Sequence, residues 1–203
     1  MTAADRESVA VDYSVIDHLY RIETGTYKGA NAIALGRFRR AAEGGNIVVW
    51  VAEITPVEML QGREKVMQSP ETLEWVSAKD ERKVEICRSM NARYLAYPCS
   101  KLDDTYSRLG MSFRLAGPES HAANAFEERL LTIPDVSPGD ARQLTSCAFP
   151  VAVDALNSVV KIQWFVAEDA LLIAALRQAR LPELAHVSIG SSSDWLSSHH
   201  DLP

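Results

Sequence analysis

The chain has 203 residues, 47% hydrophobic and 24% charged, and a formal net charge of −6. This length and composition are typical of one globular domain with a full hydrophobic core, so we expect a single domain over residues 1–203. The negative net charge argues against electrostatic binding of nucleic acid over the whole surface, although a local basic groove is compatible with it.

The first predicted elements are a strand and two helices. The apolar run of residues 8–11 ends at Asp12 and predicts a strand. Helical patterns follow at residues 15–23 and 30–43, and the second is stopped by the glycine pair at 44–45. Residues 46–52 form a continuous apolar run, which is typical of a strand buried on both faces of a parallel sheet.

The middle of the chain is dominated by helical patterns. Thr55-Pro56-Val57-Glu58 predicts a short helix, with Thr as the cap, Pro at the first position and Glu three residues after the cap. A long charged helix is predicted to begin at Pro70 and to run to about Asn91. The later predictions, in chain order, are a strand at 93–97, a helix at 119–131, a helix from Ser137 towards Leu156, a strand at 162–167, a helix at 170–179 and a strand at 185–189.

Strands that alternate with helices predict a three-layer α/β/α sandwich around a central, mainly parallel sheet. We expect extra material, an insertion or extension, within about residues 62–135. Residues 1–8 lack the build of a signal peptide. No apolar run approaches the roughly 18 residues that span a bilayer. The three cysteines form no CxxC pair, which favours free thiols in a reducing compartment. We therefore expect a cytoplasmic protein without membrane contact.

Four acidic residues carry the functional prediction. Asp12 and Asp169 end predicted strands, whereas Glu58 and Asp140 lie in the first turns of predicted helices. In open parallel sheets, functional groups gather beyond the carboxyl ends of the strands. Carboxylates are the ligands of hard divalent ions such as Mg²⁺, which uses one or two of them directly and keeps several waters. Because a metal-bound water can attack phosphorus, the pattern indicates a metal-dependent acidic active site.

Each of these acidic residues also has an alternative, purely structural interpretation. Glu58 and Asp140 stand three residues after a Thr or Ser cap, where a carboxylate stabilises the helix by roughly 0.5–2 kcal/mol without any catalysis. For Asp12 and Asp169 we expect no comparable structural task. Asp17 and Glu53 are the next candidates as ligands, and we expect Glu168 to be a solvated turn residue. The five histidines show no ligand spacing, and His199 and His200 are expected in a frayed tail.

Four segments together resemble the motifs of PIN-domain nucleases, in the order of that family. They are Val9-Ala10-Val11-Asp12-Tyr13-Ser14-Val15-Ile16-Asp17-His18-Leu19, Val51-Ala52-Glu53-Ile54-Thr55-Pro56-Val57-Glu58-Met59-Leu60, Gly139-Asp140-Ala141-Arg142-Gln143-Leu144 and Trp164-Phe165-Val166-Ala167-Glu168-Asp169-Ala170-Leu171-Leu172. The resemblance implies a Mg²⁺- or Mn²⁺-dependent nuclease, commonly a ribonuclease that leaves a 5′-phosphate and a 3′-hydroxyl. Asp12, Glu58, Asp140 and Asp169 would be the catalytic metal ligands, and Ser14 would either support a metal ligand or contact a phosphate.

The same resemblance sets the expected partners. Many members are toxins of bacterial toxin–antitoxin pairs, so we expect an RNA substrate and an antitoxin-type protein partner, and a homodimer is among the expected assemblies. Arg142, close to Asp140 in the sequence, could meet a substrate phosphate, and a local salt bridge is an equal alternative.

Two other functions stay open at this stage. Tyr13 and Ala167 depart from the motifs, and they favour a PIN-like binding or regulatory module with weak or no catalysis. A phosphatase or receiver domain that phosphorylates its own Asp is the second rival. It is disfavoured because Ser14 stands where such phosphatases carry a second Asp, and because no lysine ends a late strand.

Overall fold

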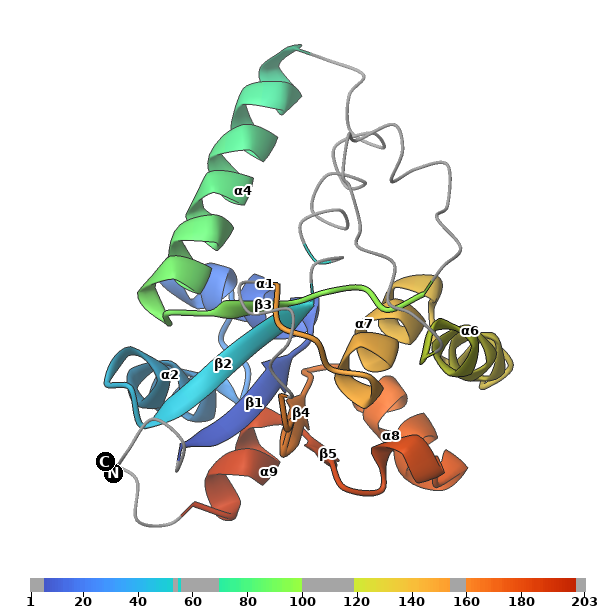
Figure 1. The fold of residues 1–203 in the computed structure, drawn as a ribbon. Helices are drawn as coiled ribbons and strands as arrows, with labels where there is room; N and C mark the ends of the chain where they lie inside the picture. Colours follow the sequence, from blue (N-terminus) through green and yellow to red (C-terminus); the bar gives the residue numbers. More distant parts are fainter. Residues whose placement is uncertain (1–5, 53–54, 56–69, 100–118, 154–159, 200–203) are drawn as a thin grey trace.

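The computed structural model describes residues 6–52, 55, 70–99, 119–153 and 160–199 (Figure 1). Five strands of this part form one sheet with every neighbouring pair parallel, in the order β3-β2-β1-β4-β5. The strands are β1 (Glu7–Val11), β2 (Ile47–Ala52), β3 (Arg93–Leu95), β4 (Trp164–Val166) and β5 (Ser188–Gly190).

Helices cover both faces of the sheet (Figure 1). They are α1 (Tyr13–Glu23), α2 (Ala32–Glu43), α4 (Pro70–Ser89), α6 (Glu119–Leu130), α7 (Pro138–Ala148), α8 (Ala170–Ala179) and α9 (Ser192–Ser197), with a short 3₁₀ helix η2 (Pro182–Leu184) before β5. The predicted α/β fold class is confirmed.

Alternate residues of the strands supply two separate cores. Val9 and Val11 of β1 pack with side chains of α1, α2, α4 and α9, whereas Ala10 between them packs with side chains of α6, α7 and α8. This alternation follows from the period-2 geometry of a strand, and it explains why strands buried on both faces are continuously apolar. The three-layer architecture is therefore a direct consequence of the apolar runs.

The order of the strands creates one reversal. From β1 the chain adds β2 and then β3 on one side, and it returns to place β4 on the other side of β1. Such a reversal is a topological switch point, where open α/β sheets place their ligand crevices, at the carboxyl ends of the strands. In this fold the switch point lies between β1 and β4.

The structure corrects the predicted end of α7. The helix stops at Ala148 instead of running towards Leu156. Pro150 accounts for the early end, because a proline disfavours the helical conformation of the residue before it. Residues 151–153 then pair antiparallel with the outer edge of β3: the N–H of Ala96 donates to the carbonyl of Val151 at 2.7 Å, and that of Val153 donates to Tyr94 at 3.0 Å.

The C-terminal part also differs from the prediction. The last strand is Ser188–Gly190 rather than 185–189, β4 is shorter than expected, and the helix α9 was not predicted. A sequence signal for α9 was present, since Ser191 and Asp194 form a capping box. The expected frayed tail is wrong at His199, whose ring contacts both Glu7 and Trp195.

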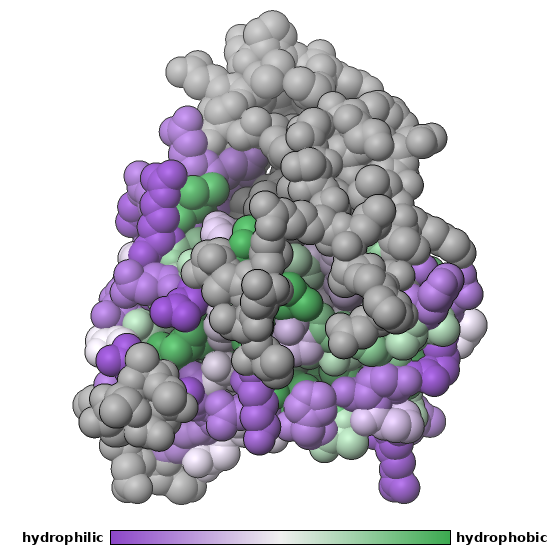
Figure 2. Space-filling model, in the orientation of Figure 1, coloured by the Kyte–Doolittle hydropathy of each residue, from purple (hydrophilic) through white to green (hydrophobic). Residues whose placement is uncertain are grey.

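The expected insertion within 62–135 falls largely outside the described residues, which in that range include α4, β3 and α6. Within the described ranges, no helix combines the length and apolar composition that crossing a bilayer requires. In the face shown in Figure 2, hydrophilic residues cover most of the visible described surface, and hydrophobic residues appear in smaller areas between them.

Candidate functional site

Asp12 lies at the switch point, directly after β1. Its backbone N–H donates to the carbonyl of Val166 at 2.9 Å, which extends the pairing of β1 with β4 by one residue. Only 4% of Asp12 is exposed. A buried carboxylate is thus held between the carboxyl ends of two adjacent parallel strands.

Ser14 connects Asp12 with the end of β4. Its N–H donates to Asp12 Oδ2 at 2.8 Å, and its hydroxyl donates to the same oxygen. The Ser14 Oγ in turn accepts a hydrogen bond from the backbone N–H of Glu168 at 2.9 Å. Because these contacts make Asp12 the N-cap of α1, the expectation that Asp12 has no structural task is wrong.

The electrostatic environment of Asp12 disfavours its charge. Burial raises the pKa of the Asp12 carboxyl above its ordinary value, the hydrogen bonds from Ser14 act against this rise, and the negative charge of Asp140 adds to it. Burial, together with the charge of Asp12, also raises the pKa of the Cys147 thiol, which is therefore an inert neighbour. Titratable groups with perturbed pKa values cluster at functional sites, so Asp12 is a candidate functional residue.

Asp140 is the second carboxylate of this region. It is half-buried, and it forms a capping box at the start of α7, accepting from the Ser137 N–H at 2.8 Å. The capping role expected for Asp140 is confirmed. The two roles are compatible, since a carboxylate that caps a helix N-terminus is held in place and its charge still acts on Asp12.

Arg142 follows on the same helix and is half-buried. Its positive charge acts on the Cys99 thiol, where burial is the main cause that raises the pKa to about 12 and Arg142 works against it. The expected contact of Arg142 with a substrate phosphate stays a prediction.

Asp169 is exposed and caps α8, accepting from the N–H groups of Leu171 at 2.9 Å and Leu172 at 3.1 Å. The expectation of no structural task is wrong here too. The residue also lines an open hollow of about 400 Å³ between α1 and α8, the α1–α8 hollow. Its lining comprises Tyr13, Ser14, Asp17, His18, Arg21, Glu168, Asp169, Ala170 and Leu171. Asp169 and Ser14 therefore share one surface, whereas Asp12 lies behind it.

Glu58 and Glu53, the remaining acidic candidates, lie outside the described residues. Thr55, the expected cap of the helix that carries Glu58, is helical and fully buried.

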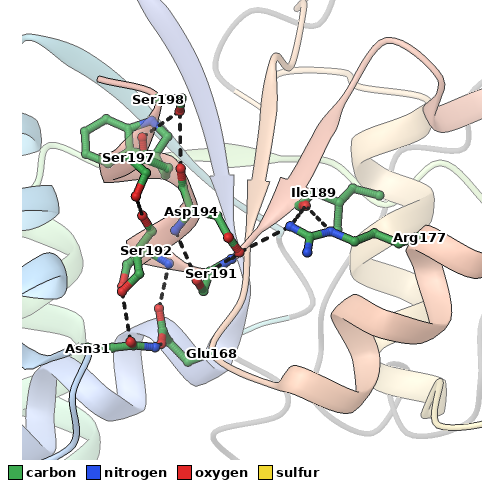
Figure 3. Close-up of polar contacts among 11 residues, drawn as sticks. Asn31, Glu168, Arg177, Ile189, Ser191, Ser192, Asp194, Ser197 and Ser198 are labelled. Carbon is green, nitrogen blue, oxygen red and sulfur yellow. Dashed lines mark hydrogen bonds and ion pairs between the residues drawn. The ribbon is translucent and has the colours of Figure 1, made fainter. Parts of the chain in front are cut away.

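Glu168 was expected to be a solvated turn residue, and this is wrong. Its carboxylate accepts from the Asn31 side-chain amide at 2.6 Å and from the backbone N–H of Ser192 at 2.8 Å (Figure 3). Its own N–H donates to Ser14. Glu168 thereby joins the start of α2, the start of α9 and the end of β4 beside Asp12. Its place directly after the buried run of β4 was the signal that could have identified it.

Lys83 is a second residue that the sequence interpretation missed. It is fully buried, and its ammonium group donates to Tyr13 Oη and to Asp17 Oδ1. Burial acts to raise the pKa of Asp17, but Lys83, with Lys79 and Arg21, outweighs this effect and lowers it. Asp17, considered above as a further ligand, is therefore occupied by cations. The signal was the spacing of Lys83 with the buried Ile86 and Met90, which places it on the apolar face of α4.

The groups around the Asp12 carboxylate bear on whether this site fits a divalent cation. Among the described residues, the Asp12 carboxylate accepts hydrogen bonds from Ser14 and from the Tyr13 N–H, and no lysine, arginine or histidine pairs with it. The described residues contain no group of three or more His, Cys, Asp or Glu side chains close enough to hold a metal ion together. Asp12 and Asp140 are two carboxylates whose charges interact at this edge, and Mg²⁺ typically binds one or two protein carboxylates directly while waters complete its shell.

The comparisons with known proteins give no relatives: no family model matches the chain, and neither curated proteins nor solved structures match it. The functional argument therefore depends on the site itself.

Proposed function

We propose that this chain is a Mg²⁺- or Mn²⁺-dependent nuclease of the PIN-like kind that hydrolyses RNA at the edge of the sheet around Asp12. Asp12 and Asp140 are the proposed direct ligands. Asp169 and Glu58 are proposed as further acidic groups of the site, as the resemblance of the four motifs implies.

One observation carries this proposal. Asp12 is buried at the switch point, its pKa is raised by burial and by a second carboxylate, and its described contacts include no cation. A buried, uncompensated carboxylate is costly, and a protein that keeps one at a ligand-binding position usually needs its charge. A divalent cation is the partner that would offset both Asp12 and Asp140.

The residues of the site have distinct tasks in this proposal. Asp12 and Asp140 bind the cation, which supplies Lewis acidity toward a phosphodiester. Ser14 holds the Asp12 carboxylate through its N–H and hydroxyl, and its contact with the Glu168 N–H fixes the carboxyl ends of β1 and β4 relative to each other. Asp169 and Ser14 face the α1–α8 hollow, the proposed approach for the RNA strand.

A binding or regulatory module with weak or no catalysis is the second candidate, and a specific observation favours it. Asp12, Asp140 and Asp169 all cap helices, so each has a task in an inactive protein as well. The described residues also lack a cluster of three metal-binding side chains. An inactive module would keep its Mn²⁺ affinity or its fold without cleaving RNA.

The test is cleavage of end-labelled single-stranded RNA in the presence of Mn²⁺ by the full chain, compared with Asp12→Asn and with an EDTA control. Asparagine caps a helix as well as aspartate does, so the variant keeps α1 while it removes the charge. Asp135→Asn is the matched control, because Asp135 is exposed and its backbone φ of 63° is readily adopted by asparagine.

The proposal expects cleavage by the wild type and by Asp135→Asn that is lost in Asp12→Asn and in EDTA. Cleavage that persists in Asp12→Asn would place the activity elsewhere or in a contaminant. Mn²⁺ binding through Asp12 without cleavage of any RNA would select the regulatory module.

A further inference from the structure

The helix α9 connects the candidate site with the opposite end of the sheet. At its start, the Ser192 N–H donates to Glu168 Oε1, and the Ser193 hydroxyl donates to Asn31 Oδ1, both at 2.8 Å. In Figure 3, Asn31, Glu168 and Ser192 lie together where β4 ends. In its middle, the fully buried Trp195 meets Phe38 edge-on at 5.0 Å between ring centroids. Its far end is held by His199 against Glu7, the first residue of β1.

Both ring nitrogens of His199 face oxygen acceptors. Nδ1 lies 2.6 Å from the carbonyl oxygen of Trp195, and Nε2 lies 2.9 Å from Glu7 Oε2. A carbonyl oxygen and a carboxylate oxygen are acceptors, so each ring nitrogen needs its own N–H. A neutral imidazole has only one N–H and would turn a lone pair toward one of these oxygens. These contacts are those of an imidazolium ring, which satisfies both acceptors, whereas a neutral ring satisfies only one.

The neighbouring groups are consistent with this assignment. The Ser198 hydroxyl lies 3.1 Å from Nδ1, but it donates to the Trp195 carbonyl at 2.7 Å. Glu7 Oε2 also accepts from the Trp195 indole N–H at 3.0 Å, as an ionised carboxylate does. The His199 ring stacks on the Trp195 ring at 4.6 Å, an arrangement in which an aromatic face attracts a cation.

The charged groups around His199 are few. The Glu7 carboxylate of β1 faces the His199 ring. The uncharged Trp164 ring of β4 meets the His199 ring edge-on. On α9 itself, the Asp194 carboxylate is held by Arg177 and by the Ser191 N–H instead (Figure 3). His200 and Asp201, the next charged or titratable residues in the sequence, lie outside the described residues. The side chains of His199 and Glu7 are 22% and 21% exposed, so their protons exchange with solvent.

We propose that the His199 imidazolium is a proton-dependent lock on α9 and that it regulates the candidate site through Ser192 and Glu168. When His199 carries only one of the two ring protons, one of its two acceptors loses its donor, and the far end of α9 loses one of its contacts. Because α9 supplies one of the three hydrogen bonds that fix Glu168, loosening of α9 reaches the residue bonded to Ser14. The lock itself follows from the contacts of His199, whereas its effect on catalysis rests on the proposed function.

The test follows two quantities on the full chain between about pH 5.5 and 9: the ¹⁵N resonances of the His199 ring, and amide hydrogen exchange of residues 193–198 corrected for its intrinsic pH dependence. Local opening of a helix is read directly by such exchange. We expect exchange of α9 to rise about tenfold over the pH range in which the His199 ring loses its proton, because a charged hydrogen bond is lost. Exchange of α8 is expected to stay constant.

Three variants make the result decisive. His199→Gln is expected to show the raised exchange of α9 at every pH, and His186→Gln, which changes an exposed histidine outside α9, should behave as the wild type. Glu7→Gln keeps an acceptor for the Trp195 indole but removes the carboxylate that His199 contacts. It should raise exchange of α9 at low pH toward the value of His199→Gln.

The proposal is overturned if His199 loses its proton while exchange of α9 stays constant, or if His199→Gln and the wild type exchange equally at high and low pH. A Glu7→Gln variant whose α9 exchanges like that of the wild type at low pH would also overturn it. None of these measurements needs RNA or metal, so the failure of the nuclease proposal would leave their outcome unchanged.

Discussion

Replacing Asp12 with asparagine is expected to stabilise the metal-free protein. The wild-type carboxylate is buried, its charge is disfavoured by burial and by Asp140, and both effects raise its pKa. Asparagine removes that charge and keeps a side-chain oxygen that accepts from the Ser14 N–H and hydroxyl. A residue retained for function against stability is typically one whose replacement makes the fold more stable.

The magnitude follows from comparing two substitutions. Asp12→Asn removes the unfavourable charge and retains the cap, so we expect a gain of about 0.5–2 kcal/mol in the free energy of unfolding. Asp12→Ala removes the same charge but also loses the cap of α1, which costs about 0.5–2 kcal/mol. These terms are of similar size, so the alanine variant should lie close to the wild type, and asparagine should be the more stable of the two.

The pH dependence has a definite sign. The folded state holds the Asp12 proton more tightly than the unfolded chain does, because the folded-state pKa is the higher one. Wild-type stability is therefore lost as the pH rises from the unfolded-state pKa of about 3.9 through the folded-state pKa. The advantage of Asp12→Asn over the wild type should be absent below about pH 4, grow with rising pH and then stay constant.

Urea unfolding of the three proteins in EDTA, at several pH values, measures these differences. Saturating Mn²⁺ should then reverse the order, since an ion present at 100 times its Kd stabilises the form that binds it by about 2.7 kcal/mol. An Asp12→Asn variant that is less stable than the wild type in EDTA at pH 7 would refute the reasoning, as it would mean that the carboxylate charge serves the fold.

Five further substitutions test the fold around the site. Asp17→Asn should lower the free energy of unfolding in urea by about 3–5 kcal/mol, because it leaves the buried Lys83 ammonium without its carboxylate. Lys83→Met should cost less, because Asp17 keeps its ion pair with Arg21 at 2.6 Å. Equal losses in the two variants would contradict this reasoning. Gly190→Ala should destabilise by about 1–3 kcal/mol, because the new Cβ would lie 2.7 Å from Asp194 Cβ. In the interior of α2, the Cβ of Gly36→Ala would meet only the Arg40 side chain, at an ordinary contact distance of 3.9 Å, and this change should stabilise by about 0.5–1 kcal/mol. Ser14→Ala should cost about 1–3 kcal/mol and raise amide exchange at Glu168, whose N–H loses its acceptor, and unchanged exchange there would contradict the bridging role of Ser14.

The fold was predictable where burial leaves a period in the sequence. The continuous apolar run of β2 predicted a parallel strand, and the helix α8 was predicted with its observed bounds. The places of Asp12 and Asp169 after β1 and β4 followed from the same runs, because the carboxyl ends of adjacent parallel strands meet at one edge.

The misses share a physical cause, which is contact between residues far apart in the chain. The local sequence predicts that Glu168 is a turn residue. Its contacts with Asn31 at the start of α2 and Ser192 at the start of α9 form only in the folded protein. The local sequence predicts that Lys83 is one of several exposed charges of a helix. Packing of α4 on α1 instead places its ammonium group against Asp17. The predicted end of α7 was wrong for a local reason. The apolar pattern continues after Pro150, but the proline disfavours a helical residue before it, so the helix ends earlier than the pattern predicts.

Mn²⁺ binding tests the central claim most directly, and electron paramagnetic resonance can titrate it on the wild type, Asp12→Asn and Asp135→Asn. The carboxylate pair of Asp12 and Asp140 predicts that the wild type and Asp135→Asn bind the ion with equal affinity and that Asp12→Asn loses this binding. Equal binding by all three proteins, or no binding by the wild type, would contradict a metal site at Asp12.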